Sequence, residues 1–226
     1  MTSEPIVEPD SGSGWLVDSF LGVLSAQLLD EVSARAMALG VAAGQYIYEP
    51  ELSIVETGVV RAYVTDSGGR QLTVSYVRSG GAVGLTHVIG RDYPVGFQAV
   101  SACRLQRLNK GQLCDLTGSE PRLGWSAAAE VTRRADEMLA EITRVTFGSL
   151  SQRTAYHLLA LTEGLGAGGE RVGVRQADVA LAVGVLRESA ARTIGRLAAT
   201  GLVRTGPGGV TVVDEEGLRR IAQARV

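Results

Sequence analysis

The chain has 226 residues, of which 45% are hydrophobic, and it carries a formal net charge of −2. This length fits one large domain or two of ordinary size. No run of about 18 apolar residues predicts a membrane span. The charge is uneven, because residues 150–226 carry 10 basic and 7 acidic side chains while residues 1–149 are acidic overall. The basic C-terminal part is compatible with nucleic-acid binding but does not require it.

The first residues predict no secretory signal. Residues 1–14 are acidic and lack a basic end followed by an apolar stretch, so we expect a disordered tail and a cytoplasmic protein. The two cysteines, Cys103 and Cys114, are too few for a disulfide scaffold and are expected to be small buried side chains. Residues 15–39 have helical spacing, with Ser25 as the N-cap of a second helix.

Residues 41–114 predict β-structure. Segments such as SIVETGVVRAYVT and QLTVSYVR alternate or are β-branched, and turn signals stand at 66–69, 79–81 and 90–94. Many short strands separated by glycine turns are typical of a sandwich or barrel. We therefore expect a β-domain over residues 15–118.

The period changes to a helical one over residues 119–147. Apolar side chains recur at spacings of three and four, as in a heptad seam, at Ala128, Val131, Ala135, Met138, Ile142 and Val145. A seam this narrow needs a partner surface. Either the helix packs on its own β-domain, or two copies form a symmetric coiled coil, which is the favoured interpretation. Residues 119–148 are then a dimerisation helix.

Residues 149–226 predict a small helical domain with a hairpin. Helices are expected at about 151–161, 175–183, 187–200 and 215–224, a loop at 164–170, and a two-stranded hairpin at 202–213. The second and third helices meet at Gly184, and glycine tolerates the positive φ of a sharp turn. Two helices joined in this way and followed by a hairpin predict a winged helix-turn-helix.

The helix that follows Gly184 carries one polar side. At 100° per residue, Glu188, Arg192 and Arg196 share an arc, and Arg187 lies at the N-terminal end. Arginine can donate two hydrogen bonds to guanine, and glutamate can accept one from cytosine. Alone, Glu188 and Arg192 would be interpreted as a surface ion pair. The helix, glycine, helix and hairpin in this order favour base recognition in the major groove.

Residues 174–221 resemble the DNA-binding domain of the Crp/Fnr family of transcription regulators. The family's Arg-Glu followed by Arg four residues after the Glu is matched by Arg187, Glu188 and Arg192. The resemblance implies an α+β protein: an N-terminal β-roll (a double-stranded β-helix like those that bind cyclic nucleotides), a dimerisation helix and a C-terminal winged helix-turn-helix. It implies a homodimer on palindromic double-stranded DNA, with RNA polymerase as a further candidate partner. It also places Arg175 and Gln176, at the start of the motif's first helix, near DNA.

The sequence departs from the family at both helix starts. Arg175 and Leu186 stand where Ser or Thr usually caps the helices. Each missing cap is expected to cost about 0.5–2 kcal/mol of stability. These departures leave open an alternative, a ligand-sensing or protein-interaction dimer whose winged helix does not bind DNA.

The resemblance also locates an effector pocket, at Gly84, Leu85, Thr86 and His87, with Arg61 nearby and with Met138 and Leu139 on the long helix. Members that bind cyclic AMP have Glu where Leu85 stands, Arg where Val95 stands, and hydroxyl-bearing residues at the positions of Met138 and Leu139. A buried phosphate without a cation is poorly held. Cyclic AMP is therefore not the expected effector.

Other effectors remain open from the sequence. His87 in an apolar pocket is compatible with haem, although a lone histidine is more often an ordinary polar residue. Too few cysteines are present for an iron–sulfur cluster. A carboxylate such as 2-oxoglutarate would need Arg61 or Arg91, and a protein without any ligand is the last alternative. No metal-ligand or catalytic spacing predicts an enzyme.

Overall fold

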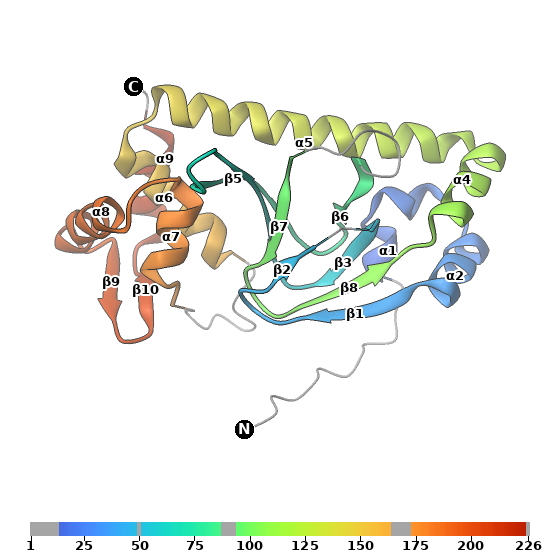
Figure 1. The fold of residues 1–226 in the computed structure, drawn as a ribbon, viewed down its shortest axis with the longest axis horizontal. Coiled ribbons are helices and arrows are strands. Elements are labelled where there is room, and N and C mark those ends of the chain that lie inside the picture. Colours follow the sequence, from blue (N-terminus) through green and yellow to red (C-terminus); the bar gives the residue numbers. More distant parts are fainter. Residues whose placement is uncertain (1–13, 49–50, 87–93, 164–172, 225–226) are drawn as a thin grey trace.

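The computed structural model describes residues 14–48, 51–86, 94–163 and 173–224. It consists of a β-rich N-terminal part and a helical C-terminal part, and the long helix α5 (Pro121–Phe147) runs along both (Figure 1). Three short helices precede the sheets: α1 (Gly14–Val17), the 3-10 helix η1 (Phe20–Val23) and α2 (Ala26–Arg35). The Ser25 hydroxyl caps α2 as predicted, because it accepts a hydrogen bond from the Leu28 amide at 3.4 Å.

In the described residues of the N-terminal part, eight strands form two antiparallel sheets. The first sheet has the order β1 (Met37–Val41), β8 (Cys103–Arg107), β3 (Ser53–Thr57) and β6 (Ala82–Val83). The second has the order β2 (Tyr46–Ile47), β7 (Gly96–Ala99), β4 (Val60–Thr65) and β5 (Gln71–Val77). Buried side chains from both sheets, among them Val55, Val60 and Leu105, form one cluster. The predicted α+β class with an N-terminal β-roll is confirmed.

Two stretches differ from the sequence prediction. The residues after Arg35 were expected to continue a helix to 39, but Met37–Val41 form β1 and pair with β8. The β-structure expected to reach 114 ends at Arg107, and Lys110–Ser119 form helix α4. Cys103 is buried as expected, but Cys114 lies on α4 and is exposed, so the expectation that it is buried is wrong. The Asn109 side chain starts that helix by accepting a hydrogen bond from the Gln112 amide at 3.1 Å. Pairing with the distant strand β8 therefore overrides the local helical pattern of Met37–Val41. The local cap at Asn109 ends the β-structure before residue 114.

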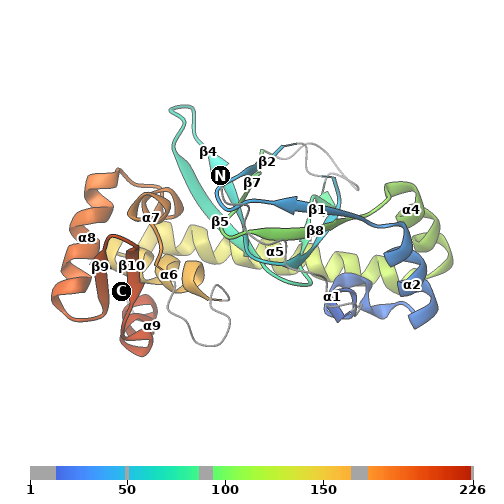
Figure 2. The same cartoon turned by 90° about the horizontal axis from the view of Figure 1, so that it is seen from below.

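The C-terminal part contains α6 (Leu150–Thr162), α7 (Gln176–Val183), α8 (Arg187–Ala199), the strand pair β9 (Val203–Gly206) and β10 (Gly209–Val212), and α9 (Glu215–Gln223). Its buried side chains, including Val179, Ile194 and Leu218, form one cluster that also takes in Val59 and Tyr76 from the β-rich part. The β4–β5 hairpin lies beside α7, and α2 and α4 occupy the opposite end of the molecule (Figure 2). No helix in the described ranges is both long and apolar enough to span a membrane.

Candidate nucleic-acid interface and effector cavity

The turn between α7 and α8 depends on Gly184. Its φ of 72° is left-handed, a conformation that side chains with a Cβ rarely adopt. An added Cβ would also approach the Leu72 Cδ1 to 3.1 Å. The two helices bury Val179, Val183 and Ile194 in their joint. The sequence prediction of two helices meeting at this glycine is confirmed.

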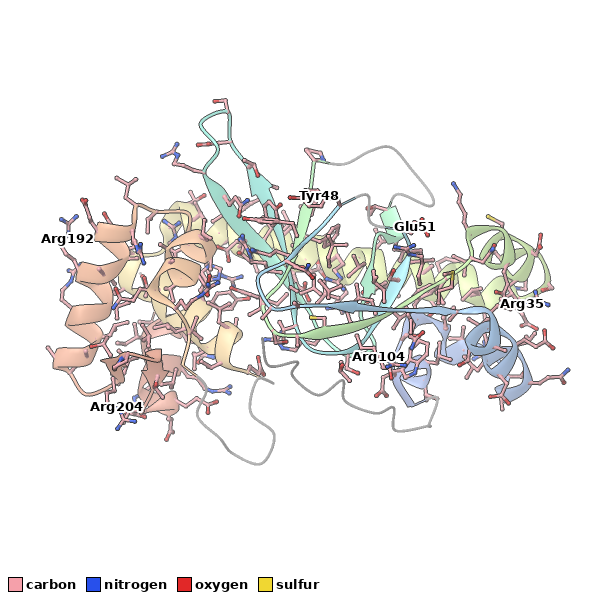
Figure 3. The ribbon with its side chains drawn as sticks, turned by 60° about the horizontal axis from the view of Figure 1, so that its bottom comes forward. Arg35, Tyr48, Glu51, Arg104, Arg192 and Arg204 are labelled. Atoms are coloured by element: carbon pink, nitrogen blue, oxygen red, sulfur yellow. The ribbon has the colours of Figure 1, made fainter. Side chains whose placement is uncertain are left out.

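Helix α8 has one buried and one exposed side. Ala190, Thr193, Ile194 and Leu197 are buried, while Arg187, Glu188, Arg192 and Arg196 are exposed. Figure 3 shows Arg192 at the outer edge of the helix, away from the β-rich part. The four predicted base-contacting side chains therefore lie together on a surface that is free within the chain.

These exposed side chains are not tied to one another. Arg192 donates to the Ser189 hydroxyl at 3.2 Å and Arg196 to the Thr193 hydroxyl at 3.3 Å. Glu188 and Arg192 lie in the described part of the chain and form no ion pair, so the surface-pair interpretation does not hold here. The Glu188 carboxylate and the Arg187 guanidinium stay available to an external partner.

The first turns of α7 and α8 lack side-chain caps. Leu186 at the start of α8 is 69% exposed and makes no capping bond, and Arg175 makes none at the start of α7. Arg175 instead forms an ion pair of 2.9 Å with Asp178, whose hydrogen bonds and charge raise the pKa of the guanidinium. Gln176 is half-buried. The amides at these two helix starts remain open to an anion such as a phosphate.

The wing adds a cation that the sequence analysis did not single out. Arg204 is exposed on β9, and Figure 3 shows it at the same end of the molecule as Arg192. Its position after the recognition helix was the only signal that could have identified it. An arginine on such a hairpin is well placed to contact a phosphate.

A cavity of about 520 Å³ lies between the second sheet and α5. Its wall is almost entirely apolar. Five residues that the sequence analysis assigned to an effector pocket line it, namely Gly84, Leu85, Thr86, Met138 and Leu139. The other apolar lining residues are Ala62, Val74, Ala82, Val95, Phe97, Val131, Ala135 and Ile142. His87 and Arg91, predicted as haem and carboxylate ligands, lie outside the described residues.

The charged groups of the cavity wall are bonded to each other. Glu130 and Arg134, one turn apart on α5, form an ion pair of 3.1 Å, and Arg133 adds a second pair to Glu130 at 2.8 Å. Burial raises the pKa of the Glu130 carboxyl, but the hydrogen bonds and charges of the two arginines outweigh it, so that its pKa lies below the ordinary value. Glu130 is therefore a carboxylate that neutralises the cation beside it.

Arg61 does not line this cavity. Its guanidinium is 3% exposed and donates to the Gln98 side chain at 2.7 Å, to the Thr73 hydroxyl at 3.3 Å and to the Gln71 side chain. It also lies 4.6 Å from the centre of the Tyr63 ring. The predicted role in the effector pocket is not supported by this placement, which links strands β4, β5 and β7.

Known proteins resemble this chain over most of its length. A family model described as a Crp-like helix-turn-helix domain matches residues 152–221. Transcriptional regulator SdrP of Thermus thermophilus is 30% identical over 172 residues, which are 74% of this chain and 82% of that protein. This chain belongs to the Crp/Fnr family. It is a DNA-binding transcription regulator of the Crp type.

Two further similarities support the assignment to the Crp/Fnr family. The cyclic AMP receptor protein of Thermus thermophilus is 30% identical over 181 residues, 79% of this chain and 80% of that protein. The crystal structure of a Crp/Fnr transcriptional regulator from the same organism matches with a TM-score of 0.70 at 27% identity and covers 84% of this chain and all of its own. The fold also matches a Crp/Fnr-family structure from Eubacterium rectale at 19% identity, with a TM-score of 0.75, over 90% of this chain and 97% of that one.

In this Crp/Fnr protein a chain of buried polar side chains links the β-rich part, the long helix α5 and the C-terminal part. The Tyr76 hydroxyl on β5 lies 3.0 Å from His157 Nδ1 on α6, and His157 Nε2 lies 3.2 Å from the Glu141 carboxylate on α5. Arg144 completes the chain with an ion pair of 2.8 Å to Glu141. Both His157 and Glu141 are only 1% exposed. Tyr76 and His157 are 81 positions apart and His157 and Glu141 are 16 apart, which is why sequence patterns did not reveal these contacts.

Burial governs the ionisation of this chain. It lowers the pKa of His157, and the hydrogen bond and charge of Glu141 oppose that effect without cancelling it. Burial also acts to raise the pKa of Glu141, but His157 and Arg144 outweigh it and the pKa lies below its ordinary value. A neutral histidine between a tyrosine and a carboxylate satisfies all three groups.

The outer side of α5 is an uncovered apolar line. Seven exposed residues recur along it at spacings of three and four, namely Trp125, Ala128, Thr132, Ala135, Leu139, Ile142 and Thr146. The predicted seam shared Ala128, Ala135 and Ile142 with this line but used Val131, Met138 and Val145 for the rest. Val131, Met138 and Val145 are half-buried, whereas the residues of the outer line are exposed. The helix thus packs on its own β-domain with one side and leaves the other side free.

Proposed function

We propose that this regulator acts as a homodimer that reads a palindromic operator, without cyclic AMP as its effector. The observation that carries the proposal is the outer side of α8, where Arg187 and Glu188 are exposed and form no ion pair with a described residue, while the inner side is buried. Buried contacts fix the helix on the domain, so the polar side is presented rigidly. Rigid presentation of donors and an acceptor is what base recognition requires.

The outer line of α5, defined by the seven residues from Trp125 to Thr146, supports the dimer. Leu139 and Ile142 are about 60% exposed in the single chain, which is costly in water. Two antiparallel or parallel copies of a heptad line bury each other, and a two-fold axis uses the same surface on both chains. Two α8 helices would then enter successive major grooves about 34 Å apart.

The cavity wall argues against cyclic AMP. Leu85 and Val95 line it where cyclic-AMP-binding members have a glutamate for the ribose and an arginine for the phosphate. Met138 and Leu139 replace the hydroxyl groups that face the adenine. The neighbouring Arg134 is neutralised by Glu130, so no free cation of the described wall offers itself to a phosphate.

Selection from a random double-stranded library, followed by a mobility-shift assay, tests the proposal. We expect the enriched sequence to be a palindrome that binds as a complex of two chains, with an affinity that falls steeply as salt rises. Arg187→Ala should lose about 1–3 kcal/mol of discrimination at one base pair of each half-site.

The matched control is Arg35→Ala, which removes the same charge from exposed α2 at the other end of the molecule. It should bind like the wild type. If no sequence is enriched, or if both variants behave alike, the proposed recognition is wrong, and the protein is better described as a ligand-sensing dimer that does not bind DNA.

A further inference from the structure

The effector cavity is unusual in how its charges are used. Glu130 and Arg134 are the charged side chains among the described lining residues, and they are bonded to each other. Taking the cavity as the effector site, which rests on the proposed function, we propose that it binds a small, uncharged, predominantly apolar molecule. An anionic effector, whether nucleotide or carboxylate, is disfavoured by the same wall.

Each of the three nitrogens of the Arg134 guanidinium already donates a hydrogen bond within the protein. Its Nε bonds to Glu130 at 3.1 Å, one terminal nitrogen to the Ser75 hydroxyl at 3.2 Å, and the other to the Ala82 carbonyl at 3.1 Å. An anion at Arg134 would lie beside the Glu130 carboxylate, which is 3.1 Å from the same guanidinium and would repel it. In a half-buried wall, this repulsion between like charges is screened less than in open water.

The size and surface of the cavity suit a neutral ligand. A volume of about 520 Å³ is in the range of small-molecule sites, which are about 300–1,000 Å³. Val74, Phe97 and Met138 present hydrocarbon, ring and thioether surface from three different elements. Ser75 and Thr86 contribute hydroxyl groups to the wall, enough to orient one polar atom of an otherwise apolar molecule.

The position of the cavity gives such a ligand a route to the DNA-binding part. Met138, Leu139 and Ile142 line it from α5, and Glu141 on the same turn bonds to His157 of α6. A ligand that repositions this turn of α5 would change the Glu141–His157 contact and hence the placement of α6. Leu139 and Ile142 also belong to the outer line of α5, so occupancy and dimer packing would be coupled.

A pair of fluorescent probes with the same ring skeleton tests the charge preference. N-phenyl-1-naphthylamine is uncharged, and 8-anilino-1-naphthalenesulfonate adds a sulfonate to that skeleton. In titrations of the full-length protein we expect the uncharged probe to bind at one site per chain and at least 10-fold more tightly than the sulfonate. Cyclic AMP should not displace it. Equal or tighter binding of the sulfonate, or displacement by cyclic AMP, overturns the proposal.

The variant Glu130→Gln gives the sharpest contrast. It frees Arg134 while keeping the shape of the wall, so the sulfonate should bind at least 10-fold more tightly than to the wild type. Glu137→Gln is the matched control, because Glu137 pairs with Arg133 and not with Arg134. An unchanged preference in Glu130→Gln contradicts the account of the wall.

The location of the bound probe is tested separately. Ala62→Phe fills the cavity from β4 and should weaken binding of the uncharged probe at least 10-fold, whereas Ala34→Phe adds the same ring on exposed α2 and should not. Equal binding of the uncharged probe by the two variants overturns the assignment of the probe to this cavity.

Operator binding is measured on the same samples. A protein that binds operator but not the uncharged probe refutes this inference alone, and one that binds the probe but not DNA refutes the proposed function alone.

Discussion

The DNA-reading end and the effector cavity use charge in opposite ways. On α8, Arg187 and Glu188 are exposed and unpaired, although the C-terminal part has carboxylates and guanidinium groups in abundance. In the cavity, Glu130 and Arg134 are paired with each other, and each nitrogen of Arg134 donates a hydrogen bond within the protein. The contrast teaches that charged side chains indicate a charged ligand only where neighbouring residues do not already pair with them.

The largest expected effect is at the junction between these two regions. Glu141→Ala removes the carboxylate that His157 and Arg144 face inside the protein. Breaking a buried pair in this way costs about 3–5 kcal/mol. Urea denaturation monitored by circular dichroism should show this decrease in the free energy of unfolding. Glu137→Ala, which breaks a partly exposed pair with Arg133, should cost about 0–1 kcal/mol. Similar losses in both variants would mean that the buried chain does not join the two regions.

A charge placed on the outer line of α5 should separate the subunits. Leu139→Glu replaces an apolar side chain whose burial in a dimer is worth about 1.5–3 kcal/mol and sets like charges against each other. Sedimentation velocity should then show monomers at concentrations where the wild type is dimeric. Ala140→Glu adds the same charge one residue away, off the line, and should remain dimeric. A dimeric Leu139→Glu variant would place the interface elsewhere.

The buried chain also predicts a pH dependence. The pKa of His157 is lowered by burial, so below about pH 6.5 the folded protein binds fewer protons than the unfolded chain. The contribution of His157 to the free energy of unfolding is complete above that pH. It is lost as pH falls, and the free energy then changes by at most about 1.4 kcal/mol per pH unit. Glu141, whose pKa is also lowered, acts in the same direction but only near and below about pH 4.3. The groups facing His157 are Tyr76, Glu141, Arg144, Arg153 and Tyr156.

Denaturation at pH 5, 6 and 7 measures this slope. The variant His157→Gln keeps a hydrogen-bonding side chain but cannot titrate, so stability between pH 5 and 7 should depend less on pH than in the wild type. If the two proteins lose stability in parallel, His157 is not the titrating group.

The smallest expected effect is at the start of the recognition helix. Leu186→Ser supplies the missing cap of α8 and removes an exposed apolar side chain, so stability should rise by about 1 kcal/mol. Thermal melting of the variant beside the wild type checks this. A melting temperature that stays the same or falls would show that the first amides of α8 gain nothing from a hydroxyl.

The winged helix-turn-helix could be predicted because its signals are local. Gly184, the apolar joint and the polar arc of α8 all lie within about twenty residues and follow helical geometry. The outer line of α5 was predicted only in part, because Val131 and Met138 fit a heptad equally well until the β-rich part covers them. The Glu130–Arg134 pair has the i,i+4 spacing of a helical ion pair, but its placement in a cavity wall depends on the fold. The position of Arg61 depends on strand register and on residues distant in sequence, which no spacing rule contains.

The central claim is that two α8 helices occupy successive major grooves of one operator. Dimethyl sulfate footprinting tests it directly, because the reagent attacks guanine N7 in the major groove, the atom that Arg187 would cover. On the selected operator we expect two protected guanine patches whose centres lie about 10–10.5 base pairs apart. Protection should vanish in Arg187→Ala and persist in Arg35→Ala. A single patch, or full protection by Arg187→Ala, would contradict the account.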